Sequence, residues 1–169
     1  PSDNKFVLPI GILQYPSFDP SLPDSANLGA VGMVVGHELG HGVDDHGARY
    51  DFYGRMKQWM TNADIKEFQK RGQRLVKQFD QSGHNGTLTL GENIGDLVGL
   101  TFAYQAAFPK DEGTTEAKKN FFLQYARAWC GVIRPKYREM LIKTDPHAQM
   151  EARVNEQVKH QAAFQQAFG

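Results

Sequence analysis

Glycine recurs every four residues along one apolar stretch, at Gly32, Gly36 and Gly40. The residues between these glycines are mostly apolar, and the pattern predicts a buried helix over residues 29–42. Each glycine costs about 1 kcal/mol relative to alanine in a helix interior, so three of them on one stripe need a compensating reason. Because this stripe carries no side chains, we expect another backbone to come close to it.

The same stretch contains His37-Glu38-Leu39-Gly40-His41, an H-E-x-x-H pattern. Residues i and i+4 of a helix lie one above the other on one face, so both imidazoles can give a nitrogen to one metal ion. Zinc accepts such ligands at about 2.0–2.1 Å. Glu38 lies further round the helix, where it can hold a water molecule rather than bind the metal. The pattern predicts one Zn²⁺ bound by His37 and His41, with Glu38 acting on the attacking water.

A catalytic zinc ion needs a third protein ligand. One class of zinc enzymes places a histidine six residues after the second one, but Gly47 stands there in this chain. Glu92 begins a later predicted helix and Asp96 follows one turn on, so both carboxylates face the same way. We expect Glu92 to bind the metal and Asp96 to accept the free N–H of a ligating imidazole. The alternative is a capping box with Thr89, in which Glu92 only bonds the start of its helix.

Asp44 follows His41 by three residues and lies on the same helical face. We expect its carboxylate to accept a hydrogen bond from a ligating imidazole. The alternative is a solvated surface acid.

The rest of the sequence predicts a mainly α fold with minor β structure. Five of the eight prolines lie in residues 1–28, so this lead-in is expected to be irregular or extended, with a short edge strand at residues 5–8. Residues 29–169 are expected to form a helical zinc-binding core, and Gly131 to end a helix in the left-handed conformation. Further helices are expected over residues 61–79, 90–108, 115–130 and 136–143, and from residue 149 onward.

Charge and hydropathy limit the partners of this segment. Its 19 basic and 19 acidic side chains cancel, which leaves no electrostatic footprint for nucleic acid or an anionic membrane. No apolar run is long enough to span a bilayer. We therefore expect a peptide or small molecule as partner, with no nucleic acid and no membrane contact. Cys130, the single cysteine, is expected to be a small buried hydrophobe.

Several stretches together carry a more specific signal than H-E-x-x-H alone. They are Leu-Pro-Ile-Gly-Ile-Leu-Gln (8–14), Val-Val-Gly-His-Glu-Leu-Gly-His-Gly-Val-Asp-Asp (34–45), Gly-Glu-Asn-Ile-Gly-Asp (91–96), Trp-Cys-Gly-Val-Ile-Arg-Pro-Lys-Tyr (129–137) and Lys-Thr-Asp-Pro-His (143–147). In content and order this set resembles the neprilysin-like family of zinc endopeptidases. The resemblance implies a gluzincin, thermolysin-like catalytic lobe, present here in part. It also implies that residues 1–169 are the C-terminal part of the catalytic domain, which would face a missing N-terminal lobe of the same protein.

The resemblance implies roles that spacing does not show. His147 matches a histidine that stabilises the oxyanion of the tetrahedral intermediate, and Arg153 matches an arginine that grips a substrate backbone carbonyl. Asp96 matches an acid that supports the first zinc histidine and is often counted as catalytic. Cys130 matches a cysteine that pairs with the N-terminal lobe in animal members. Three histidines match no functional position and are expected at the surface: His46, His84 and His160.

The expected function is hydrolysis of peptide bonds through a metal-activated water. The alternatives are a zinc aminopeptidase, a truncated fragment that binds zinc without activity, and a non-enzymatic domain in which the motif is accidental. An aminopeptidase would be marked by a glutamate-rich motif upstream of His37, and none is present. Members of the family are mostly extracytoplasmic, although some bacterial ones are cytosolic.

Overall fold

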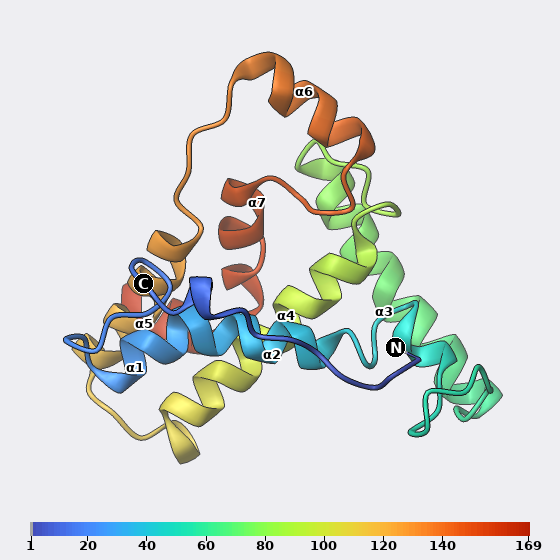
Figure 1. Ribbon diagram of the computed structural model, residues 1–169, viewed down its shortest axis with the longest axis horizontal. Helices are drawn as coiled ribbons and strands as arrows, with labels where there is room; N and C mark the ends of the chain where they lie inside the picture. The colour runs from blue at the N-terminus through green and yellow to red at the C-terminus, as the bar shows by residue number, and fades with distance from the viewer. Residues whose placement is uncertain (1) are drawn as a thin grey trace.

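The computed structural model describes residues 2–169, most of which lie in helices (Figure 1). Their order is η1 (Ile10–Ile12), α1 (Asp24–Asn27), η2 (Leu28–Gly32), α2 (Met33–Gly40), η3 (Gly47–Arg49), α3 (Asn62–Gln81), α4 (Leu90–Ala107), η4 (Pro109–Asp111), α5 (Thr115–Ala128), α6 (Pro135–Thr144), α7 (Met150–Asn155), η5 (Val158–His160) and α8 (Ala162–Phe168). A mainly α fold is therefore confirmed. No helix in this part of the chain combines the length and hydropathy needed to cross a bilayer.

Strand structure is almost absent from the described residues. The β pairing found there is one isolated antiparallel bridge between Tyr50 and Met56. Residues 5–8 are extended and exposed, and they pair with no strand of this part of the chain, so the expected edge strand is wrong. An extended segment becomes a strand only where a neighbouring strand completes its hydrogen bonds, and the segment runs past helices instead (Figure 1).

The buried helix begins earlier than expected and contains a wider turn. Helical backbone starts at Asp24, directly after Pro23, and continues through the π-helical turn η2 into α2. The residues from Asp24 to Asn27 are mostly polar, which explains why apolar periodicity placed the start at residue 29. At the other end, α2 stops at Gly40 rather than at residue 42.

Glycines allow α2 and α4 to cross in backbone contact. A Cβ atom added to Gly36 would lie 2.9 Å from Cα of Gly99, and one added to Gly99 would lie 2.6 Å from the backbone nitrogen of His37. Gly40 meets Gly95 in the same way, with an added Cβ 3.1 Å from its Cα. The expected close approach is confirmed, and its partner is α4. Gly32 takes no part, because an added Cβ there would meet only a side chain of its own helical run.

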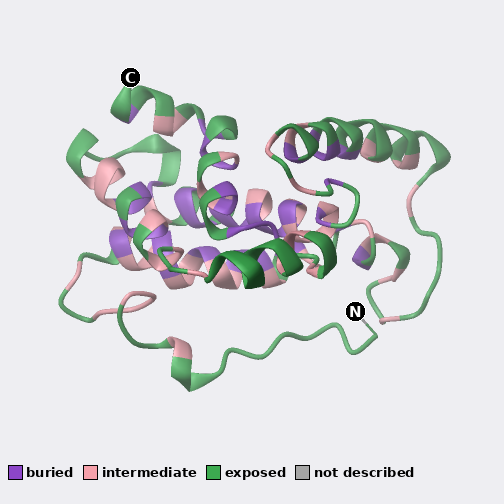
Figure 2. Ribbon diagram, turned by 90° about the horizontal axis from the view of Figure 1, so that it is seen from above, coloured by how far each residue is buried: buried purple, intermediate pink, exposed green. Residues whose placement is uncertain are grey.

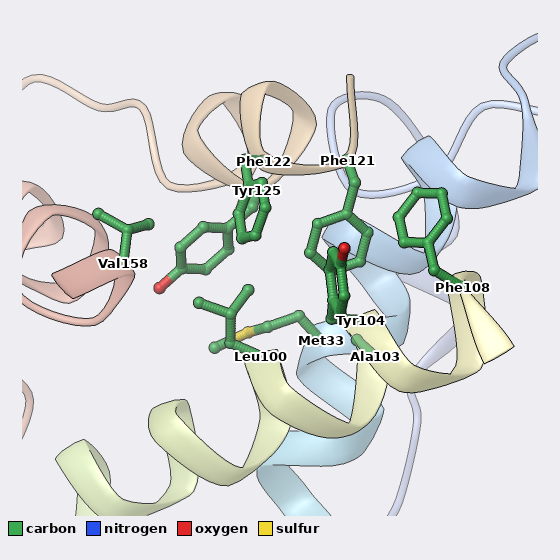
Figure 3. Packing of buried hydrophobic residues seen from close by; sticks show 9 residues of the cluster. All are labelled: Met33, Leu100, Ala103, Tyr104, Phe108, Phe121, Phe122, Tyr125 and Val158. Carbon is green, nitrogen blue, oxygen red and sulfur yellow. The ribbon is translucent and has the colours of Figure 1, made fainter. Parts of the chain in front are cut away.

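An aromatic core fills the space on one side of this crossing (Figure 3). Rings from α4 and α5 pack edge to face, as in the pair Tyr104–Phe121, whose centroids lie 5.4 Å apart. Burying each such side chain contributes about 1.5–3 kcal/mol. The buried members are Met33, Leu100, Ala103, Tyr104, Phe108, Phe121, Phe122, Tyr125 and Val158. This cluster fixes α2, α4 and α5 against each other.

A second, smaller cluster joins α3 to the other side of α4. Thr61 is the N-cap of α3, so this helix starts where it was expected. The cap is a capping box in which Thr61 and Asp64 each accept the other's backbone N–H. Its buried side chains Leu75 and Phe79 pack against Ala148 and Ala152, at the start of α7. The segment between α6 and α7 is thereby brought over the N-terminal end of α4.

The region around Cys130 differs from expectation. Helix α5 ends at Ala128 with Trp129 as its cap, and Gly131 does not adopt the left-handed conformation. Cys130 follows in the connection to α6 and is exposed, so the buried position expected for it is wrong. Helix α6 itself buries no residue (Figure 2).

The crossing predicts a sharp difference between two glycine-to-alanine substitutions. Gly99→Ala should lower the free energy of unfolding by about 1–3 kcal/mol, because its methyl group enters the backbone of α2. Gly72→Ala in α3 should be neutral or stabilising, because its methyl group meets only Leu90 at 3.6 Å. Urea unfolding followed by circular dichroism measures both. Equal midpoints for Gly99→Ala and the wild type would contradict the backbone contact.

Candidate metal centre

Three side chains from two helices converge beside the crossing of α2 and α4. His37 and His41 lie one turn apart on α2, with ring centroids 4.5 Å apart. Glu92 lies in the first turn of α4. One donor atom from each of the three lies within 4.8 Å of the others. The structure thus brings together the three residues that the sequence predicted as metal ligands.

The separations of these donor atoms suit a small cation. Oε2 of Glu92 lies 3.2 Å from Nε2 of His37, and Oε1 lies 3.6 Å from Nε2 of His41. Two ligands that each lie about 2.0–2.1 Å from one tetrahedral zinc ion are about 3.4 Å apart. The observed pairs fall on either side of that value.

The capping-box alternative for Glu92 is wrong. The side chain of Thr89 accepts no backbone N–H at the start of α4. Its hydroxyl instead donates to the carbonyl of Asn85 and accepts from the amide of Asn93. The carboxylate of Glu92 is therefore free of a capping role and faces the histidines.

A buried carboxylate contacts Nδ1 of each histidine. Nδ1 of His37 lies 2.8 Å from Asp96, and Nδ1 of His41 lies 2.8 Å from Asp44. Asp44 is itself oriented by two backbone N–H groups of the following turn. With Nδ1 engaged as a donor, the lone pair of each Nε2 points toward Glu92. The hydrogen bond with Asp44 also raises the pKa of His41 above its ordinary value.

The carboxylates favour positive charge in the cluster. Burial alone would lower the pKa of His37, but Asp96 and Glu92 outweigh it and raise that pKa to about 9. Burial opposes the ionisation of Glu92, yet the neighbouring His147 and His37 hold its pKa well below its usual range. The cluster therefore holds positive charge beside Glu92, as protons or as a cation.

One buried atom tests whether these residues fit a metal ion. Oε2 of Glu92 is inaccessible to solvent and receives no well-formed hydrogen bond from the described residues. Nε2 of His37 and Nε2 of His147 lie 3.2 and 3.0 Å from it without the alignment of a hydrogen bond, so a cation held between Glu92 and the histidines would complete its contacts. Two imidazole nitrogens and one carboxylate oxygen are a donor set of catalytic zinc. The residues therefore fit a divalent cation of this kind.

Glu38 and an open cavity lie on the solvent side of the cluster. The cavity has a volume of about 390 Å³, and Glu38, His41 and Glu92 form part of its wall. Lys5 and Phe6 of the extended N-terminal segment line the same cavity. A water molecule or a substrate can thus reach Glu38 and the ligand cluster from this side.

His147 reaches the cluster from the connection between α6 and α7. Its Nε2 lies 3.0 Å from Oε2 of Glu92, and its Nδ1 lies 2.7 Å from Asp145. Contact with Glu92, followed by the effect of Asp145, raises the pKa of His147 above its ordinary value although burial opposes this. An imidazole expected from the resemblance to act on the substrate therefore lies at the edge of the ligand cluster.

Arg153 has a partner that the sequence did not reveal. Its side chain is buried on α7 and forms two hydrogen bonds to Asp96, at 2.8 and 2.7 Å. The guanidinium also lies 3.9 Å from the ring centroid of Trp129. Arg153, to which the resemblance assigns a substrate contact, is thus already bound to Asp96, the carboxylate that also contacts Nδ1 of His37.

His84 also has a contact that the sequence analysis missed. It is half-buried, and its Nε2 accepts the backbone N–H of Gln149 at 3.0 Å, so its expected surface position is wrong. Ser-Gly-His-Asn-Gly around it has the composition of an ordinary loop. No spacing within that loop could indicate a contact with a residue 65 positions later. His46 and His160 are exposed, as expected.

The sequence and the fold match those of known peptidases. The sequence profile described as Peptidase family M13 matches residues 1–169. Membrane metallo-endopeptidase-like 1 of Mus musculus is 37% identical over 99% of this chain and 24% of its own length. Neprilysin of Homo sapiens is 38% identical over 98% of this chain and 24% of its own.

A solved structure agrees with these sequence matches. The zinc metalloprotease ZMP1 of Mycobacterium tuberculosis, in complex with an inhibitor, superposes with a TM-score of 0.89 at 36% identity. The match covers 99% of this chain and 28% of that structure. This chain thus spans about a quarter of the length of the proteins it matches.

The Arg153–Asp96 pair predicts a large effect on stability. Arg153→Met should lower the free energy of unfolding by about 3–5 kcal/mol, because the buried Asp96 loses the guanidinium and keeps only the imidazole of His37 as a partner. Arg71→Met is the matched control, because both side chains of its pair with Glu67 are exposed, and the loss should be much smaller. Urea unfolding in the presence of a chelator measures both. Similar losses in the two variants would show that the buried pair is not what stabilises this region.

Proposed function

Because this chain belongs to peptidase family M13, we propose that it carries the catalytic centre of a zinc-dependent endopeptidase. The observation that carries the proposal is the convergence of His37, His41 and Glu92, with both Nδ1 atoms held by carboxylates. These three residues would bind one Zn²⁺ and leave a coordination position open toward the cavity beside Glu38. The name of ZMP1 as a zinc metalloprotease supports the choice of metal.

The chemistry divides between the metal and the protein. A bound zinc ion would supply Lewis acidity toward a carbonyl oxygen and a lowered pKa for water. Glu38, on the cavity wall, would take the proton from the attacking water and pass it to the leaving amine. The N–H of His147 would stabilise negative charge developing on the substrate carbonyl oxygen.

Arg153 would act while bound to Asp96. A guanidinium has five N–H donors, and the hydrogen bonds to Asp96 use two of them. A remaining donor can bind a substrate carbonyl, and the pairing with Asp96 fixes the plane of the guanidinium for that contact. Asp96 would thus position the first zinc histidine and the substrate-binding arginine with a single side chain.

We propose that peptide cleavage also needs a wall that this segment does not provide. Leu39 and Val43, beside the ligand cluster, leave 54% and 43% of their surface exposed. In the longer relatives, an N-terminal lobe of the same protein would cover this side. Residues 29–169 would then be the zinc-binding core of the C-terminal part of the catalytic domain, with residues 1–28 as its lead-in. A zinc-loaded but inactive segment is the alternative.

The proposed location is outside the cytoplasm, with a cytosolic enzyme as the alternative. The relative named membrane metallo-endopeptidase-like 1 supports the first. Fractionation of the source cells, with detection of this chain by antibody, distinguishes the two.

Glu92→Gln should weaken zinc binding by about 100-fold or more. Substitutions of residues that merely support a ligand typically cost 10–100-fold, and the loss of a ligand costs at least as much. Titration against a chromogenic chelator gives the affinity, and elemental analysis gives the stoichiometry. Glu67→Gln on the exposed face of α3 serves as the control. Wild-type affinity in Glu92→Gln would remove Glu92 from the ligand set.

Glu38→Gln should keep one zinc ion per chain and lose peptide hydrolysis by about 10²–10⁴-fold, because the amide cannot accept the proton of the attacking water. An internally quenched peptide with a blocked amino terminus, given to the full-length protein, measures turnover and also separates an endopeptidase from an aminopeptidase. Full activity in this variant would refute the role of Glu38. Cleavage only of unblocked peptides by the wild type would favour the aminopeptidase.

A further inference from the structure

The segment that carries His147 is held at both ends by side chains. Residues 145–149 connect α6 to α7 without regular structure. At the first end, Oδ1 of Asp145 accepts the backbone N–H of His147 and lies 2.7 Å from its Nδ1. At the other end, the backbone N–H of Gln149 donates to Nε2 of His84 at 3.0 Å. His147 therefore lies midway between two anchors, one of which belongs to the loop that leads into α4.

The hydrogen bonds of His84 define one protonation state of its ring. Oγ of Ser82 donates to the carbonyl of Phe79 at 2.9 Å and lies 3.1 Å from Nδ1 of His84. Because the hydroxyl proton is used, Oγ accepts from Nδ1–H. Nε2 is then left with a lone pair, which accepts the N–H of Gln149. Only the neutral ring with its proton on Nδ1 satisfies both contacts.

This contact replaces a helix cap. Gln149 is the N-cap of α7, which has only six residues and no side-chain cap at its start. The first N–H groups of a helix have no partner within the helix, so an acceptor from outside stabilises this end. His84 supplies that acceptor from the α3–α4 connection, only a few residues before Glu92. The contact thus ties the start of α7 to the part of the fold that presents the metal ligand.

We propose that His84 is a positioning residue: by accepting the N–H of Gln149, it holds residues 145–149 so that His147 stays beside Glu92. The inference rests on the proposed function for the role of His147, but the contact itself can be tested without turnover. Protonation of Nε2 would place two donors opposite each other and break the anchor, so the geometry also makes the anchor dependent on pH.

The charged groups around His84 come from two helices. Arg138 of α6, Glu151 of α7 and Glu156 directly after α7 line a cavity of about 230 Å³ beside the ring. Burial, followed by the positive charge of Arg138, holds the pKa of His84 below its ordinary value, although Glu156 opposes this. The ring is therefore neutral at pH 7, the anchor is formed, and it is lost as the pH falls through that lowered pKa.

Two variants separate the hydrogen bond from the rest of the side chain. His84→Leu removes the acceptor, whereas His84→Gln keeps an oxygen acceptor near the position of Nε2 and does not titrate. His160→Gln is the matched control, because its ring contacts Gln78 rather than the segment that carries His147.

The first measurement is nuclear magnetic resonance on the ¹⁵N-labelled chain. A scalar coupling between the Gln149 amide nitrogen and Nε2 of His84 should be present at neutral pH and disappear on acidification. The Gln149 amide should exchange slowly with solvent in the wild type, His84→Gln and His160→Gln, and quickly in His84→Leu. Absence of the coupling, or slow exchange in His84→Leu, would overturn the proposal.

The second measurement is peptide hydrolysis across pH with the zinc-loaded protein that includes the N-terminal lobe. His84→Leu should lower kcat by about 10–100-fold with little change in KM, because a misplaced His147 affects the transition state more than substrate binding. His84→Gln should restore kcat and remove one ionisation from the acidic side of the kcat profile. Equal loss in both variants would indicate mere structural damage and overturn the proposal. If the wild type cleaves no peptide even with its N-terminal lobe present, the proposed function fails, while the resonance measurements still decide the role of His84.

Discussion

The backbone contact between α2 and α4 is the constraint on which the site depends. Gly36 and Gly40 let α4 approach so closely that Gly95 and Gly99 lie against the backbone and ring of His37. A helix pair with ordinary side chains at the interface keeps its axes about 8–10 Å apart. At that distance, the carboxylate of Glu92 would be carried away from the imidazoles of α2. Glycine in a helix costs conformational free energy. In return, the close contact places three donor residues on two rigid helices within reach of one another.

A single buried carboxylate then organises the charges around that donor set. Asp96 is fully buried and contacts both His37 and Arg153. A buried anion is tolerated only when it is paired and hydrogen-bonded, so either cation alone leaves Asp96 less well compensated. The consequence is a coupling between parts of the site with different tasks. The orientation of His37, a proposed metal ligand, and that of Arg153, the proposed substrate-binding arginine, depend on the same two oxygen atoms.

The convergence of the three proposed metal ligands could be predicted from the sequence because most of its geometry is local. The i, i+4 spacings of His37/His41 and Glu92/Asp96 fix which side chains share a helical face, and the glycine stripe shows that a second backbone comes close. The partner of Arg153 and the contact of His84 with Gln149 lie 57 and 65 residues away along the chain. The spacing of residues within one helix gives no information about contacts between residues so far apart in the sequence. The start at Asp24, the exposure of Cys130 and the unpaired residues 5–8 were missed because tertiary surroundings decide them.

The two halves of the site differ in how they are held. His37, His41 and Glu92 lie on helices that are packed by backbone contact and by an aromatic core, so their geometry follows from the fold itself. His147 lies on an irregular segment, which is restrained by the side chains of Asp145 and His84, by the packing of Ala148 and by the contact of His147 with Glu92. Local opening of such a segment requires far less free energy than parting α2 from α4. Metal affinity and turnover can therefore respond separately to pH and to substitution, because the ligand set stays in place when the segment that carries His147 moves.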